Sequence, residues 1–171
     1  MQAKCGELVS WHFAHLPGET DCSEHHYEPE TTWHRDWKSV APIECCEVVH
    51  NGCRADVMTL TGWAVEFQRL ALPAEIVQVR ERAHRRVLWI VNAAEAYEAD
   101  RLILRQRDGY QTFRWHHAAR WWSACRGRVT LDLGDSVFVV RKAYFNAPVS
   151  GWGHLMDRKI AKARLAAACQ R

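Results

Sequence analysis

The sequence lacks long apolar runs, which limits the surroundings in which the protein can fold. No part of its 171 residues approaches the roughly 18 consecutive apolar residues that span a bilayer. The first residues, MQAKCGELVSWHFAH, also lack the apolar core of a secretory signal peptide. We therefore expect no membrane partner and, as the default, a cytoplasmic protein.

Two further absences concern charge and cysteine. The net charge of +3 is too small to indicate a nucleic-acid partner by itself, and none of the seven cysteines belongs to a CxxC pair. An odd number of cysteines without a signal peptide indicates reduced thiols instead of a disulfide framework. Internal repeats and low-complexity linkers are also missing, so the length fits one domain with a sizeable core, with or without a small appendage.

Basic charge is concentrated in the second half of the chain. Residues 101–128 contain seven arginines and one acidic residue, and residues 157–171 contain five lysines or arginines against one aspartate. Within the stretch FRWHHAARWWSACRGR, Arg114 and Arg120 can neutralise phosphates and Trp115 can stack on a base. The alternative is that the tryptophans belong to the core and the arginines to a solvated rim.

Hydrophobic periodicity divides the chain into three parts and predicts an α/β fold. Residues 1–29 show little periodicity and are expected to be irregular. A core over residues 30–92 should contain a helix, three antiparallel strands, a helix and a strand, at 30–40, 43–49, 54–60, 63–70, 73–86 and 87–92. Because the last strand follows a crossover helix, it should pair in parallel within a mixed central sheet flanked by helices.

The third part, residues 93–171, has a looser pattern. We expect a strand at 110–115, a hairpin over 129–142 and a basic helix over 155–169. These elements are expected to form an extension that packs on the core.

Two carboxylates and an amide lie in the stretch RADVMTLTGWAVEFQ. Alternate residues of a strand share a face, so Glu66 and Gln68 should point the same way, and Asp56 on the preceding strand should reach the same place. With the carbonyl of Phe67 and water, the two carboxylates would suit Mg²⁺, which prefers one or two carboxylates plus waters and substrate phosphate. The alternative is three polar residues on the solvated face of a hairpin.

The predicted first helix adds three polar side chains at four-residue steps. Glu30, His34 and Lys38 would share one helix face. Packed against the hairpin, Glu30 would supply a third carboxylate that binds the metal directly or through water. His34 would contact phosphate or aid proton transfer, since its ordinary pKa lies near neutrality, and Lys38 would pair with phosphate. The alternative is an ordinary amphipathic helix.

Together these segments resemble the PD-(D/E)xK nuclease superfamily. Asp56, followed about ten residues later by Glu66-x-Gln68, is similar to the motif of that superfamily, with Gln in place of the usual Lys. The chain resembles the CoiA-like competence nuclease family more closely. HFAH and the PG after it, ETTWHRDWK, RADV, VEFQ and EIVQVRERAHRRVLWIVN, which carries Arg80, follow in that family's order over about residues 10–92.

The resemblance implies a restriction-endonuclease-like core and hydrolysis of DNA phosphodiester bonds that depends on Mg²⁺ or Mn²⁺ and leaves 5′-phosphate and 3′-hydroxyl ends. It implies that Asp56, Glu66 and Glu30 bind the metal. Gln68 would orient the attacking water, His34 would assist from the helix, and Arg80 and Lys38 would contact nucleic acid. Because an amide carries no charge, Lys38 or a second metal would supply the charge of the usual Lys.

Other residues keep two further functions open. Cys5, His12, His15 and Cys22 could bind Zn²⁺, because thiolate and imidazole suit that ion, although their spacing contains no CxxC knuckle. A small zinc-stabilised interaction protein is therefore one alternative. The other is a non-catalytic nucleic-acid-binding protein that keeps the nuclease fold. The sequence does not predict a protein partner.

Overall fold

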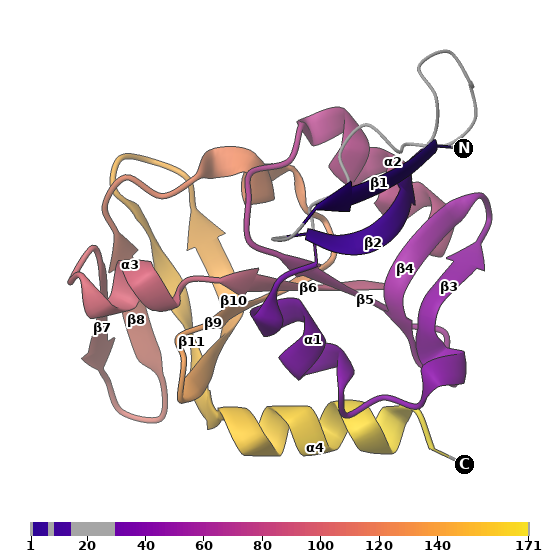
Figure 1. Cartoon of the computed structure of the whole chain (residues 1–171). Coiled ribbons are helices and arrows are strands. Elements are labelled where there is room, and N and C mark those ends of the chain that lie inside the picture. The colour runs from indigo at the N-terminus through magenta and orange to yellow at the C-terminus, as the bar shows by residue number, and fades with distance from the viewer. Residues whose placement is uncertain (1, 7–8, 15–29, 171) are drawn as a thin grey trace.

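The computed structural model of the protein describes residues 2–6, 9–14 and 30–170, the first two ranges as backbone only. These residues form an α/β structure with one mixed nine-stranded sheet and four helices (Figure 1). A separate antiparallel hairpin pairs β1 (Gln2–Gly6) with β2 (Val9–Ala14), so the prediction of an irregular segment was wrong for these two ranges. None of the helices in the described part of the chain has the length and apolar character needed to cross a membrane.

The predicted order of core elements, a helix, three strands, a helix and a strand, is confirmed. These elements are α1 (Thr32–Lys38), β3 (Cys46–His50), β4 (Cys53–Met58), β5 (Ala64–Gln68), α2 (Ala74–His84) and β6 (Val87–Asn92), with a short 3₁₀ turn, η2 (Ile43–Cys45), before β3. The remainder consists of α3 (Ala94–Glu98), β7 (Leu102–Gln106), β8 (Gln111–Trp115), η3 (Arg120–Ala124), β9 (Arg128–Asp132), β10 (Ser136–Tyr144), β11 (Val149–Asp157) and α4 (Arg158–Ala168). Of these, α3, β7, η3 and β11 were not predicted.

The sheet runs continuously through the predicted core and the predicted extension. Its strand order is β3-β4-β5-β6-β9-β10-β11-β8-β7. As expected after a crossover helix, β6 pairs in parallel with β5, and it also pairs in parallel with β9 on its other side. The residues beyond 92 therefore extend the same sheet instead of packing on it as a separate layer.

Two apolar clusters lie on opposite faces of this sheet. Successive residues of β6 alternate between them, since Trp89 belongs to one cluster and Ile90 to the other. The first cluster includes Trp122 of η3 together with residues of α2. The second is covered by Trp37 of α1 and Leu165 of α4. Figure 1 shows α1 and α4 lying near each other, as a shared cluster requires.

The buried carboxylate of Asp132, the last residue of β9, joins α1 and α4 to the sheet. Its Oδ2 accepts hydrogen bonds from Nε1 of Trp33 and of Trp37, each at 2.7 Å, and from Nε of Arg158 at 3.0 Å. Arg158 also donates to Asp36 of α1 at 2.6 Å. Three buried or half-buried donors from two helices thus share one acceptor, and this fixes the position of α1 over the sheet.

Replacing Asp132 should destabilise the protein strongly. Asp132→Ala leaves Nε of Arg158 and two indole N–H groups without their acceptor, although Arg158 keeps its ion pair with Asp36, and this should lower the free energy of unfolding by roughly 3 kcal/mol. Urea unfolding followed by tryptophan fluorescence measures the change. Asp135→Ala, at an exposed position after β9, is the control and should change stability by less than about 0.5 kcal/mol. Equal losses in the two variants would contradict this role of Asp132.

Candidate functional site

Asp56 lies where the pairing of β4 and β5 ends. The ladder pairs Val57 with Val65 and Met58 with Ala64. Beyond these pairs, the Phe67 N–H donates at 2.7 Å to Oδ2 of the Asp56 side chain. The carboxylate thus takes the place of a backbone acceptor, and its second oxygen faces the residues brought there by other elements.

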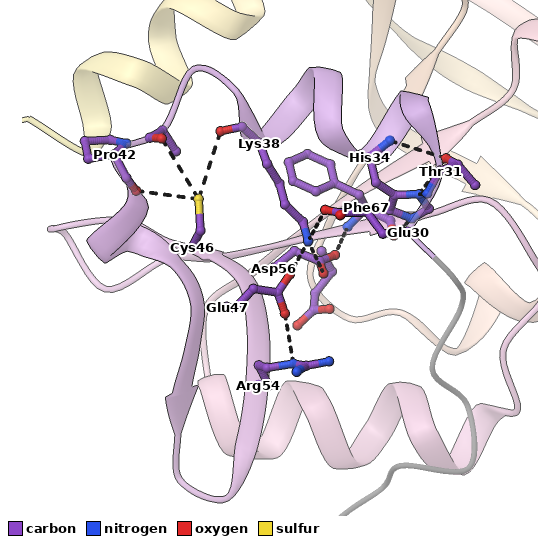
Figure 2. A network of polar contacts seen from close by, with 12 residues as sticks. Glu30, Thr31, His34, Lys38, Pro42, Cys46, Glu47, Arg54, Asp56 and Phe67 are labelled. Atoms are coloured by element: carbon purple, nitrogen blue, oxygen red, sulfur yellow. Dashed lines mark hydrogen bonds and ion pairs between the residues drawn. The ribbon is translucent and has the colours of Figure 1, made fainter. Parts of the chain in front are cut away.

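A lysine ammonium lies among three carboxylates at this position (Figure 2). Lys38, the last residue of α1, lies 3.0 Å from Oε1 of Glu30 and 3.8 Å from Oδ1 of Asp56, and it donates to Oε1 of Glu47. Burial lowers the pKa of Lys38, but the hydrogen bond to Glu47 and the charges of Asp56 and Glu47 outweigh burial and raise it above its ordinary value. Lys38 is therefore a permanent cation within the cluster.

Glu47 is a member of this cluster that the sequence reasoning missed. It stands opposite Asp56 in the register of the β3–β4 hairpin, and its backbone is left-handed, with φ of 54°. A residue with a side chain adopts this conformation at a cost of about 1–2 kcal/mol, and such strain is often retained at functional sites. Oε2 of Glu47 also accepts from Nε of Arg54 at 2.9 Å.

A signal for Glu47 was present in the sequence. The turn residues Asn51 and Gly52 have positive φ, as the tightest hairpin turns require, and Asn-Gly is the pair typical of them. A two-residue turn pairs His50 with Cys53, and counting back along both strands pairs Glu47 with Asp56.

Glu66 is completely buried on β5 and faces two side chains of α2. Its Oε2 accepts from Nη1 of Arg80 at 2.5 Å, and its Oε1 lies 3.5 Å from Nε2 of His84. Neither Oε1 of Glu66 nor the ring nitrogens of His84 have a hydrogen-bond partner among the described residues. Arg80 and His84 are four residues apart, so they share one face of α2.

Burial dominates the protonation of this site. It raises the pKa of Glu66 to about 8, against the opposing charge of Arg80 and with a further rise from Asp56. Burial also raises the pKa of Asp56, although Lys38 and the Phe67 N–H oppose the rise. For His84, burial lowers the pKa to about 4, so the ring is neutral at pH 7. Ionising the Asp56 and Glu66 carboxyl groups at the same time is therefore costly.

His34 and Gln68 are held by backbone groups. The buried His34 ring lies 3.1 Å from the Phe67 carbonyl through Nε2, and its Nδ1 accepts from the N–H of Thr31 at 3.3 Å. With both nitrogens engaged, His34 positions α1 against β5 and does not face outward to a phosphate. The Gln68 amide is buried and donates to the carbonyl of Leu70 at 2.8 Å.

Glu30 is not placed as a third metal ligand. The side chain of Thr31 caps α1, so the helix begins at Thr32 and Glu30 precedes it. The Glu30 carboxylate instead pairs with Lys38. Across the described part of the chain, no group of three or more His, Cys, Asp or Glu side chains is arranged to hold a metal ion.

The predicted nucleic-acid contacts separate into exposed and engaged residues. Arg114 and Arg120 are exposed, whereas Trp115 is buried in the core, so its predicted stacking on a base was wrong. Lys38 and Arg80 are held in the ion pairs described above. Composition indicated aromatic residues in this stretch but could not indicate which of them face the core.

The predicted zinc ligands lie at the N-terminal end of the chain. Cys5 belongs to β1 and His12 to β2, both described as backbone only. His15 and Cys22 lie outside the described residues.

Comparison with known proteins gives no relative. No family model, curated protein or solved structure matches the chain. The geometry of the site is therefore the basis for any functional conclusion.

Glu66 should make the protein less stable as the pH rises from about 6.5 to about 8 in the absence of divalent cations. The folded state keeps the proton of Glu66 up to about pH 8, whereas the unfolded chain releases it near 4.5. The folded state thus binds more protons in this interval, and stability falls by up to about 1.4 kcal/mol per pH unit. Between about pH 4 and 6.5, His84 has the opposite effect because its folded pKa is lowered.

Urea unfolding at a series of pH values measures this contribution. Glu66→Gln should remove the slope between about pH 6.5 and 8, and the exposed Glu95→Gln should keep it. An unchanged slope in Glu66→Gln would show that Glu66 is already ionised in the folded protein.

Proposed function

We propose that the protein is a metal-dependent nuclease that hydrolyses phosphodiester bonds in DNA, with Asp56 and Glu66 as the metal-binding carboxylates. One observation carries the proposal: Oε1 of Glu66 is buried without a hydrogen-bond partner among the described residues, in a cluster with the Asp56 carboxylate. A buried polar atom that lacks a partner is costly unless a ligand completes its coordination.

The donor set fits a hard divalent cation. Mg²⁺ and Mn²⁺ suit oxygen ligands, and Mg²⁺ commonly takes only one or two carboxylates, with waters and substrate phosphate completing the shell. A cation near Asp56 and Glu66 would also offset the cost of ionising both groups, which burial makes high.

The side chains around the two carboxylates have distinct tasks in this proposal. When bound, the cation would activate a water and neutralise the charge of the phosphate. Arg80 holds Glu66 through Oε2 and leaves Oε1 free for the cation. His34 fixes the Phe67 carbonyl, and the Phe67 N–H fixes Asp56. Lys38 would supply positive charge to the substrate, the role for which the neutral Gln68 is unsuited.

The arrangement of elements supports a restriction-endonuclease-like core as part of this proposal. The order α1, β3, β4, β5, α2 and β6, with β5 and β6 parallel, matches the order that the resemblance implied. The two carboxylates come from neighbouring strands, with α1 and α2 contributing Lys38 and Arg80.

A non-catalytic nucleic-acid-binding protein is the second candidate. The ion pairs favour it, because Lys38, Arg54 and Arg80 already bind the carboxylates of Glu30, Glu47, Asp56 and Glu66. Three cations against four carboxylates leave little negative charge to attract a metal. Metal-dependent cleavage separates the two candidates.

Asp56→Asn and Glu66→Gln should each reduce DNA cleavage by more than about 100-fold. Even the outer partners of metal ligands contribute about 10- to 100-fold, so loss of a ligand should cost more. Labelled single-stranded, duplex and branched DNA with Mg²⁺ or Mn²⁺ provide the assay, and a chelator should abolish cleavage by the wild type. Glu66→Gln should remain folded near pH 7, because it removes a carboxyl that burial keeps protonated.

Exposed carboxylates elsewhere provide matched controls. Asp135→Asn and Glu95→Gln make the same chemical changes and should cleave like the wild type. If the wild type binds DNA without cutting it under any of these conditions, the protein is a binding module with a nuclease-like site.

A further inference from the structure

A second surface of the described molecule has the character of a binding site. It is a concavity of about 360 Å³ near the β7 edge of the sheet, whereas Asp56 lies near the β3 edge. Its lining combines basic and aromatic side chains: Arg105, Arg107, Arg114, Tyr110, Tyr144 and Trp152. We propose that this surface, called here the arginine–aromatic face, binds single-stranded nucleic acid.

Strand register arranges the side chains of this face in two rows. Across β7, β8, β11 and β10, one row is Arg105, Thr112, Trp152 and Lys142, and the next is Ile103, Arg114, Ser150 and Tyr144. Cross-strand partners share a face, and the two rows are offset by two residues along each strand, so all of them share the same side of the sheet. Four strands spaced by about 4.8 Å make each row roughly 14 Å long.

Other aromatic side chains fill the core beneath this face. The aromatic rings on the face are therefore not needed to complete the core. On β11, a Cβ at Gly151 would lie 2.7 Å from Cε1 of Phe113, and one at Gly153 would lie 2.8 Å from Cε1 of Phe138. These phenylalanine rings fill the inner side of the strand, while Trp152, between the two glycines, points to the other side and is 38% exposed. Its ring lies edge-on to Tyr110 at 5.8 Å.

The arginines of this face have no acidic partners. Within residues 30–170, no carboxylate lies at ion-pair distance from Arg105, Arg107 or Arg114, whereas Arg80 and Arg158 are both paired. Uncompensated positive charge suits a polyphosphate chain, and exposed rings suit bases. Only an unpaired strand offers both, because the bases of a duplex already stack on one another.

This inference deepens the proposed function, on which the choice of nucleic acid as the ligand rests. It names single-stranded DNA as the form that the protein holds. Binding at the arginine–aromatic face needs no divalent cation, so binding can be measured separately from cleavage.

The test is fluorescence anisotropy of a labelled oligothymidylate with the full chain in the presence of a chelator. Trp152→Ala should weaken binding roughly tenfold, because stacking on one aromatic ring typically contributes that much, and Trp152→Phe should restore most of the loss. The double variant Arg105→Ala/Arg114→Ala should also weaken binding. It should reduce the dependence of log affinity on log salt by about 0.7 for each phosphate that the variant no longer neutralises.

The chain offers a matched control for net charge. Another concavity of about 360 Å³ contains Arg82, Arg85 and Arg126 but no aromatic side chain. Arg82→Ala/Arg126→Ala removes the same charge and should bind like the wild type. Tyr97→Ala, an exposed ring on α3, is the control for Trp152→Ala.

Each outcome either supports or overturns the inference. Equal weakening by the two arginine pairs would show diffuse attraction to charge, and normal binding by Trp152→Ala would exclude stacking on this face. A wild type that binds duplex and single strand equally, or neither, would also overturn it. If the wild type binds through this face but never cleaves, the nuclease proposal fails alone. If it cleaves while the face variants bind normally, this inference fails alone.

Discussion

The candidate site depends on the hydrogen bonds that the buried carboxylate of Asp132 accepts. This carboxylate accepts indole N–H groups from Trp33 and Trp37, one turn apart on α1, so the helix is held at two points. Lys38 follows Trp37 directly, and its ammonium therefore reaches the β3–β4 hairpin in a fixed position. Through Arg158 the same carboxylate also holds α4. Asp132, at the end of β9, thus determines where the Lys38 ammonium meets the Asp56 carboxylate. Asp56 is on β4, which lies two strands beyond β6, the neighbour of β9.

The carboxylates of the site differ in how readily their charge can change. Lys38, with its pKa raised by its acidic neighbours, keeps Glu30 and Glu47 in stable ion pairs. Glu66 is different, because burial favours its protonated form even beside Arg80. A divalent cation at Glu66 would have to displace this proton, so metal affinity would rise with pH. The partly exposed ion pairs give the cluster its geometry, and the buried carboxyl is the group whose state a metal would alter.

Features that depend on neighbouring residues were predictable from the sequence, and features that depend on distant contacts were not. The apolar run of β6 and the alternation around Glu66 identified the core strands. The contacts of Asp132 join residues 95 and 99 positions apart, and no local pattern indicates them. Strand β11 was missed because Gly151 and Gly153 occupy its inward positions, where a strand pattern would have apolar side chains.

The candidate catalytic site and the arginine–aromatic face belong to one continuous sheet, and this constrains how they could cooperate. From β4, which carries Asp56, to β11, which carries Trp152, there are five strand spacings, which at about 4.8 Å each amount to roughly 24 Å along the sheet. A side chain at Trp152 therefore cannot touch a phosphate at Asp56. In the proposed reaction its contribution to binding would be the same in the ground state and the transition state, and such uniform binding would change KM and leave kcat unaltered. By contrast, in the proposed reaction charge would develop near Asp56 and Glu66, so changes there should act on kcat. If the proposed function holds, the two surfaces should therefore be kinetically separable although the same sheet fixes both.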